Sequence, residues 1–398
     1  MLPRQSPVLL SGLLLLSFAG GCGIFTNHDP EVVYEQALAK VEAEQFTEAQ
    51  ADLDRLRKLR PMTVLDHGLQ ARIHMAAGRN LEALAELAAI PDDHGLAGWA
   101  RLRRGQLYRQ LFDFRRAESE FRAAIRLDSG SIVARRELVY ILGLQLRRAE
   151  LNQIFLELSR LTTLGPKEVW VWCMVRDLVW WVPEEQIPIL QKAIASDPDD
   201  LASRLAVVEV LRRNSRIDDA NRELASLPPD LPEALAKRLE MLVEAEGPEN
   251  AVNLLQKIPD NNAQASLIRG RLALASGNAR EAIRYFEMAD RSDPGRRQVL
   301  ADLGRAWGLA GDQAKARDFT QKAGRVDALN NLLLKSENTV EKSGPTEWKQ
   351  FALACEKAGR LNEARAWLAL LIQKNPLDES AQAEIYRIDQ TLKSAVNH

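Results

Sequence analysis

The residue types that most often perform chemistry are sparse and poorly grouped in this 398-residue sequence. Of its five histidines, only His67 and His74 share a predicted helix, and the helical rise separates them by roughly 10 Å. That distance is too long for two ligands of one zinc ion. The sequence contains no paired C-x-x-C, phosphate-binding glycine loop or nucleophile-elbow motif. We therefore predict no metal site, no cofactor and no catalytic residue.

Adjacent acidic residues are the remaining candidates for acid–base chemistry. The pairs Asp92-Asp93, Asp199-Asp200 and Asp218-Asp219 stand at predicted turns and helix starts, where carboxylates accept hydrogen bonds from free backbone amides. Catalytic carboxylates instead need a buried cleft, of which the pattern shows no sign. We interpret these pairs as helix caps.

The charge of the chain limits its choice of partner. Lysine and arginine number 53 and aspartate and glutamate 55, so the formal net charge of −2 argues against nucleic acid, whose phosphates need a positive surplus. Arginine is nevertheless dense from Arg101 to Arg148. That stretch is compatible with solvated helix faces and with a docking surface for an acidic partner.

The N-terminus has the pattern of an export signal. Arg4 precedes an apolar run that ends at Phe18, and small residues follow. The tetrapeptide Ala19-Gly20-Gly21-Cys22 resembles the lipobox of bacterial lipoproteins. The resemblance implies that Cys22 carries a lipid and tethers the exported chain to a membrane. Ordinary cleavage near Gly21 and an uncleaved membrane anchor remain open as alternatives.

A period near 34 residues organises the rest of the chain. The clearest unit contains Gly270, Gly277-Asn278, Ala282, Phe286, Ala289 and Pro294, and a small residue returns every 34 residues at Ala49, Ala83 and Ala117. This pattern resembles the tetratricopeptide repeat, in which two antiparallel helices approach closely where a small side chain meets a large one. The resemblance implies an all-α fold, a right-handed α-α superhelical solenoid of helical hairpins.

The predicted organisation runs from the export signal to a closing helix. Its parts are a signal peptide at 1–21, a short tether at 22–29, N-terminal repeats at 30–130, degenerate tryptophan-rich repeats at 131–200, repeats at 201–328, a polar insertion at 329–344, a final repeat at 345–376 and a capping helix at 377–398.

Tetratricopeptide proteins commonly hold peptides or helices on the concave face that their first helices line. By this resemblance, the groove positions include Arg72, Trp99, Arg109, Arg136, Tyr140, Arg271 and Arg305. Arginine pairs well with carboxylates, so we expect a protein partner with acidic segments. Gly68, Arg72, Leu102 and Gln106 stand where the family's chaperone-binding clamp needs Lys and Asn, which argues against chaperone-tail recognition.

The segment from Trp170 to Trp181 holds four of the chain's eight tryptophans and is apolar on all sides. It is either a repeat buried on both faces or a hydrophobic patch, with Trp172 and Trp180, that binds a partner. If each repeat contacts only its neighbours, Cys173 and Cys355 lie several repeats apart and cannot meet.

These patterns predict a non-enzymatic protein–protein interaction scaffold of the bacterial cell envelope, exported and anchored to a membrane. An adaptor for envelope polysaccharide or peptidoglycan machinery is the alternative, and an enzyme of unknown type is the remote one. The choice among them depends on the site, because a fold does not assign a function.

Overall fold

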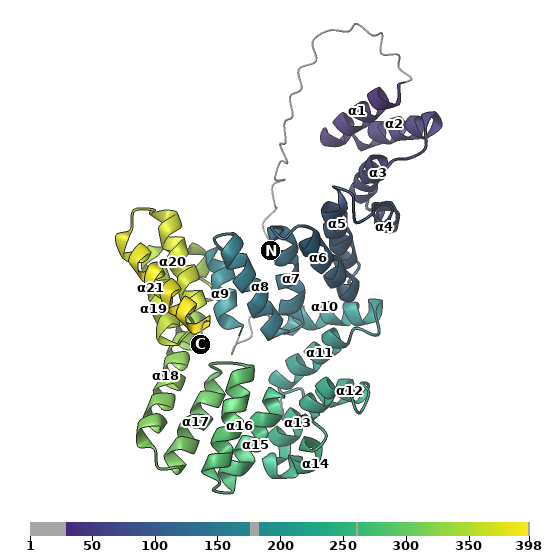
Figure 1. Ribbon diagram of the computed structural model, residues 1–398. Coiled ribbons are helices and arrows are strands. Elements are labelled where there is room, and N and C mark those ends of the chain that lie inside the picture. The colour runs from purple at the N-terminus through teal and green to yellow at the C-terminus, as the bar shows by residue number, and fades with distance from the viewer. Residues whose placement is uncertain (1–28, 176–182, 260–261, 397–398) are drawn as a thin grey trace. The chain divides into compact units, whose positions relative to one another are not determined.

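The computed structural model describes residues 29–175, 183–259 and 262–396, and within these ranges it contains helices and turns but no strand. The predicted all-α solenoid of hairpins is confirmed. The chain divides into two compact units, with the division between Ile90 and Pro91. Figure 1 shows the helices of each unit.

The first unit consists of two helical hairpins. Helix α1 (Pro30–Glu42) pairs with α2 (Phe46–Leu59), and α3 (Val64–Ala76) pairs with α4 (Asn80–Ala88). Val33, Ala37, Ala49 and Leu53 are fully buried between the helices. The predicted small residue Ala49 therefore lies in the core of the first hairpin.

The second unit continues the succession of antiparallel helices. Its helices up to the middle of the unit are α5 (Ala97–Gln110), α6 (Phe114–Leu127), α7 (Ile132–Leu144), α8 (Arg148–Leu161), α9 (Pro166–Met174), α10 (Pro183–Ser196), α11 (Leu201–Arg213), α12 (Ile217–Ala225) and α13 (Pro232–Glu246). The remaining helices are the 3₁₀ helix η1 (Pro248–Ala251), α14 (Val252–Leu255), α15 (Ala263–Ala275), α16 (Ala279–Ser292), α17 (Arg297–Leu309), α18 (Gln313–Ser336), the 3₁₀ helix η2 (Val340–Lys342), α19 (Pro345–Lys357), α20 (Leu361–Lys374) and α21 (Glu379–Val396).

The hairpins turn at a residue in the left-handed backbone conformation, and this position recurs with the repeat. It is occupied at intervals of 34 residues by Glu44, Gly78, Phe112 and Leu146, with φ of 59°, 70°, 60° and 53°. In the third of these turns the Asp113 amide donates to the Tyr108 carbonyl at 2.9 Å, which satisfies a free carbonyl of the first helix. The Asp113 carboxylate then caps the second helix by accepting from the Arg116 amide.

The predicted contact between small and large residues is confirmed in the hairpins. A Cβ atom added at Gly105 on α5 would lie 2.5 Å from the Phe121 ring on α6, and Gly270 meets Phe286 in the same way. Both phenylalanine side chains are fully buried. The absence of a side chain at these glycines therefore allows the two helices of a hairpin to pack closely.

One stretch differs from the predicted organisation. Residues 329–344 are not a polar insertion throughout, because α18 continues to Ser336 and fully buries Leu329 and Leu333. In the stretch predicted as degenerate repeats, α7 and α8 form a regular hairpin with Leu138 and Leu151 in its core. Apolar side chains other than those of the repeat signature complete the packing there.

Candidate functional site

The structure places each predicted groove residue on the first helix of a hairpin. Arg72 lies on α3 of the first unit, and the others lie in the second unit: Trp99 and Arg109 on α5, Arg136 and Tyr140 on α7, Arg271 on α15 and Arg305 on α17. Arg136 and Arg305 are exposed, and the other five are partly buried. We call the polar side chains of α5, α7, α9, α11, α13, α15 and α17 the first-helix face.

Ion pairs connect the first helices of successive hairpins. Arg109 on α5 contacts Glu137 on α7, with 2.8 Å between Nε and Oε2. Arg136 on α7 donates through Nε and Nη2 to the two carboxylate oxygens of Glu168 on α9, at 2.8 and 3.1 Å. The Arg109 guanidinium also lies 5.2 Å from the centre of the Tyr140 ring. Arginine and carboxylate groups thus alternate along this part of the first-helix face.

The same arrangement returns in the later repeats. Arg271 on α15 pairs with the fully buried Asp302 on α17 at 2.9 Å, and Arg305 pairs with the same carboxylate. On α11, burial opposes ionisation of Glu209, but the neighbouring Lys237 on α13 and Arg212 outweigh it and hold the Glu209 pKa far below its usual range. Each described carboxylate in these contacts neutralises a nearby cation.

These pairs change the interpretation of the arginine-lined groove. The groove arginines 109, 136, 271 and 305 contact carboxylates of this chain: Arg109 and Arg136 each have one of their own, and Arg271 and Arg305 share that of Asp302. An acidic partner segment would have to displace Glu137 or Glu168 to reach them. The charge of the first-helix face therefore does not by itself support an acidic partner.

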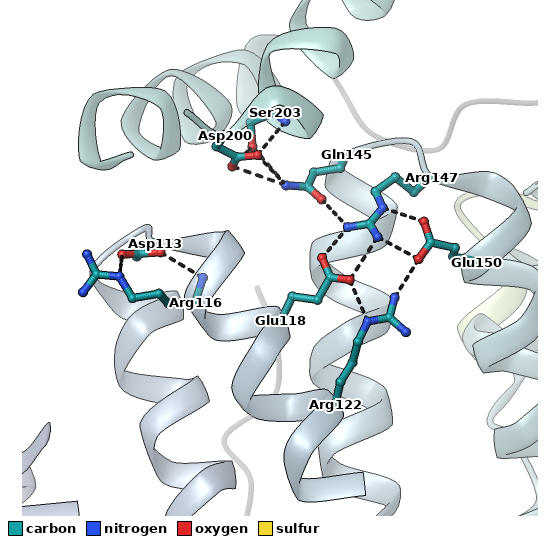
Figure 2. Close-up of polar contacts among 9 residues, drawn as sticks. All are labelled: Asp113, Arg116, Glu118, Arg122, Gln145, Arg147, Glu150, Asp200 and Ser203. Carbon is teal, nitrogen blue, oxygen red and sulfur yellow. Dashed lines mark hydrogen bonds and ion pairs between the residues drawn. The ribbon is translucent and has the colours of Figure 1, made fainter. Parts of the chain in front are cut away.

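A polar network explains part of the arginine-dense stretch (Figure 2). The Arg147 guanidinium donates to Glu118 at 2.9 Å, to Glu150 at 2.7 Å and to the Gln145 side-chain oxygen at 3.2 Å. The amide of Gln145 donates in turn to the hydroxyl of Ser203 on α11 at 3.1 Å. The network therefore links α6 and α8 to the start of α11.

Burial and ion pairing shift the pKa values of this network in opposite directions. Burial opposes the charge of Glu118, but hydrogen bonds from Arg147 and Arg122 outweigh it and lower the Glu118 pKa. For the same reason the pKa of Arg147 is raised despite its burial. The sequence indicates this network only through its density of arginine, because the carboxylates that pair with the arginines come from separate helices. These groups stabilise the arrangement of helices by pairing each buried charge with an opposite one.

Helix α9 packs against the last repeats of the second unit, a contact that the sequence did not indicate (Figure 1). The Trp170 indole donates to the Leu333 carbonyl on α18 at 3.0 Å, and Arg360 donates to the Cys173 carbonyl at 2.6 Å. The Sγ atoms of Cys173 and Cys355 are 3.5 Å apart. The prediction that these cysteines cannot meet is wrong, because contacts in this unit are not restricted to neighbouring repeats.

Trp172 belongs to the core in this structure and not to an exposed patch. Its side chain is 1% exposed, its ring stacks on Phe155 with 5.9 Å between centroids, and its indole donates to the Asn152 side chain at 2.8 Å. Trp180 and Cys22 lie outside the described residues. Of the two interpretations of the tryptophan-rich segment, burial holds for Trp172.

Other candidate chemistry is limited to pairs of side chains. His67 contacts Glu86 at 2.6 Å, and among the described residues no group of three histidine, cysteine or acidic side chains is placed to hold a metal ion. Asp200 caps α11 through the Ser203 amide, as predicted for the acidic pairs. None of the helices in the described ranges is both long and apolar enough to cross a membrane.

Two family models of the tetratricopeptide repeat match the sequence, one at residues 34–97 and 242–326 and the other at residues 100–130. Tetratricopeptide repeats are recognised over these ranges. They occur in both units, and the matched ranges include the α5–α6 and α15–α16 hairpins in which glycine meets phenylalanine. Repeats of this kind generally mediate protein–protein interaction.

Solved structures similar to this chain have low sequence identity to it and include a tetratricopeptide repeat protein. A tetratricopeptide repeat protein from Parabacteroides merdae is 15% identical, with 70% of this chain and 98% of that one covered and a TM-score of 0.28. The human IFIT1 dimer with m7Gppp-AAAA is 14% identical, with coverage of 94% and 89% and a TM-score of 0.35. The APC/C hetero-tetramer Cut9-Hcn1 is 14% identical, with coverage of 91% and 90% and a TM-score of 0.33. Comparison with curated proteins finds no match.

Proposed function

We propose that this chain is a non-catalytic scaffold that binds segments of partner proteins on its first-helix face. The observation that carries the proposal is the presence of tetratricopeptide repeats in both units. Stacked hairpins expose successive first helices as a continuous surface, which suits an extended or helical segment. The alternation of arginine and carboxylate along this face supplies hydrogen-bonding groups without a large net charge.

The partner segment that suits this face carries both polar and apolar side chains. Tyr140 offers a partly buried ring beside Arg109, and Arg136 and Glu168 form an exposed pair one helix further along. A segment that brings its own opposite charges and one apolar anchor satisfies these groups without displacing the internal ion pairs. A purely acidic segment meets the carboxylates of Glu137 and Glu168.

The experiment is chemical crosslinking in intact cells, followed by identification of the captured proteins. Tyr140→Ala and Arg136→Glu are expected to reduce partner capture by about tenfold, equivalent to about 1.4 kcal/mol of binding. Arg222→Glu is the matched control, because Arg222 lies on the second helix α12 with a side chain that is 75% exposed. Equal capture by all three variants would show that the first-helix face is not the binding surface.

We further propose that the scaffold is exported and tethered to a membrane of the cell envelope through lipidated Cys22. The support is the sequence pattern before Cys22, which resembles a lipobox. Metabolic labelling with a fatty-acid analogue is expected to mark the wild-type chain and not Cys22→Ala, while Cys355→Ala keeps the label. Labelling of Cys22→Ala contradicts lipidation at that residue, and the mass of the purified chain then distinguishes simple cleavage from a retained anchor.

A further inference from the structure

Two cysteines that are distant in sequence meet inside the second unit. Cys173 on α9 and Cys355 on α19 are separated by 182 residues, and their sulfur atoms are 3.5 Å apart. Both side chains are fully buried. Helices α10 to α18 lie between them in the chain, so this contact joins the two ends of a long segment.

The surrounding contacts hold the two cysteines in position. Arg360, which precedes α20 and is 2% exposed, donates to the Cys173 carbonyl at 2.6 Å. Trp170, one helical turn before Cys173, donates to the Leu333 carbonyl at 3.0 Å. Near Cys355, the Phe351 and Trp367 rings stack with 4.6 Å between their centroids. The cysteine pair is thus built into an ordered interface and is not a chance approach of two surface side chains.

We propose that Cys173 and Cys355 form a disulfide that clasps α9 to the last repeats of the second unit. A disulfide has an S–S distance of about 2.05 Å, so the sulfur atoms have to approach by about 1.5 Å. An approach of this size requires rotation of the cysteine side chains or a small shift of α9 against α19. The interface is otherwise held by side-chain packing and hydrogen bonds between helices far apart in the chain, and a covalent link would make it permanent under oxidising conditions.

The oxidation is an ordinary thiol–disulfide exchange. The Cys355 thiolate attacks an oxidant disulfide, whose S–S bond breaks and releases one thiolate, and the Cys173 thiolate then attacks the Cys355 sulfur and releases the other. Two protons and two electrons leave the cysteine pair, and the oxidant disulfide becomes two thiols. Glutathione disulfide serves as the oxidant in solution, and a disulfide of a thiol oxidase serves in the cell.

The timing of this reaction follows from burial. Burial raises the pKa of the Cys355 thiol well above its ordinary value, so the reactive thiolate is scarce while the interface is closed. The exchange therefore proceeds before α9 docks, or when α9 transiently separates from α19 and α20. Once formed, the disulfide is shielded from reductants by the same burial.

The first test is carried out on the purified full chain and does not depend on export. The reduced chain is incubated with glutathione disulfide at a urea concentration below the unfolding transition, then alkylated and digested. We expect a peptide pair linked through Cys173 and Cys355 in excess of any link to Cys22. We also expect a higher urea midpoint for the oxidised chain than for the reduced one, and no such difference in Cys173→Ala or Cys355→Ala.

Three outcomes of this test would overturn the clasp. One is a cysteine pair that stays reduced although hydrogen exchange shows that α9 opens. Another is a predominant link between Cys22 and either buried cysteine. The third is a disulfide that forms but lowers the urea midpoint, since a clasp has to stabilise the contact that it joins. The comparison of the oxidised with the reduced wild-type chain tests the clasp even if an alanine variant fails to fold.

The use of the clasp in the cell rests on the proposed export, because disulfides persist in oxidising compartments and are rare in the cytosol. Acid quenching of intact cells, followed by alkylation, is expected to show the Cys173–Cys355 disulfide in the exported chain. An exported chain with both thiols free overturns the clasp and leaves export intact. A chain found in the cytosol overturns export, and the result in glutathione then decides whether the clasp forms.

Discussion

Substitution of Gly105 by alanine tests whether the close approach of α5 and α6 depends on the absence of a side chain. The new Cβ would lie 2.5 and 2.6 Å from two atoms of the Phe121 ring and 3.0 Å from a third. Because ordinary contacts between carbon atoms are about 3.5–4.0 Å, the ring or a helix has to move by about 1 Å. Phe121 is fully buried, so its ring cannot move out into solvent.

The magnitude follows from comparison with a second glycine. Overpacking of this kind typically costs about 1–3 kcal/mol, whereas alanine in place of glycine within a helix gains about 1 kcal/mol. Gly324 on α18 has no atom within 4 Å of an added Cβ, so Gly324→Ala shows the helix gain alone. We therefore expect Gly105→Ala to be less stable than Gly324→Ala by about 1–3 kcal/mol.

The assay is urea unfolding of both variants, with hydrogen exchange to locate the destabilised hairpin. Gly105→Ala is expected to speed exchange in α5 and α6 first, and Phe121→Leu in the same chain is expected to recover part of the loss. Equal stabilisation by Gly105→Ala and Gly324→Ala would refute the argument, because it would mean that the hairpin accommodates a methyl group without strain.

Three further predictions concern other parts of the fold. Glu44 and Gly78 both have positive φ, so Glu44→Gly is expected to stabilise the first unit by about 0.5–1 kcal/mol and Gly78→Ala to destabilise it by about 1 kcal/mol. Urea unfolding followed by circular dichroism measures both changes. A loss of stability in Glu44→Gly would contradict the argument. Burial opposes ionisation of Asp66, but hydrogen bonds from Arg60 and Thr63 hold its pKa below the ordinary 3.8. Because the pKa of Asp66 is lower in the folded chain, its ion pair contributes fully to stability above the ordinary pKa of 3.8, and this contribution is lost as the pH falls through the folded pKa. The free energy of unfolding is therefore expected to depend less on acidic pH in Asp66→Asn. An unchanged pH profile in that variant would contradict the argument. Trp172→Ala is expected to destabilise the second unit by about 3–5 kcal/mol, because it removes a fully buried ring; urea unfolding measures this, and a variant as stable as the wild type would contradict the burial.

The repeat pattern predicted most of what is local in this protein. The turns at Gly277-Asn278 and Gly311-Asp312 end one helix and begin the next, because a left-handed residue followed by a capping side chain is a property of a few adjacent residues. Gly270 and Phe286 could be paired in advance because their spacing is set by one hairpin. The export signal and Cys22 remain predictions from the sequence.

The site was harder to predict than the hairpins. The positions of Arg109, Arg136 and Arg271 on first helices followed from the repeat, but their partners did not. Glu137, Glu168 and Asp302 each come from the next first helix, about one repeat further along the chain. An arginine-rich pattern therefore suggested a cationic groove, whereas the folded chain supplies the compensating carboxylates.

The sequence by itself determined the helical hairpins, their turns and the small residues that let them pack, since these depend on contacts within one repeat. Only the tertiary structure decided that α9 meets α18 and α20, that Trp172 is buried and that Cys173 approaches Cys355. The physical reason is that repeat periodicity records interactions between neighbours. A contact across 182 residues leaves no periodic trace and arises only when the packed helices bring the chain back upon itself.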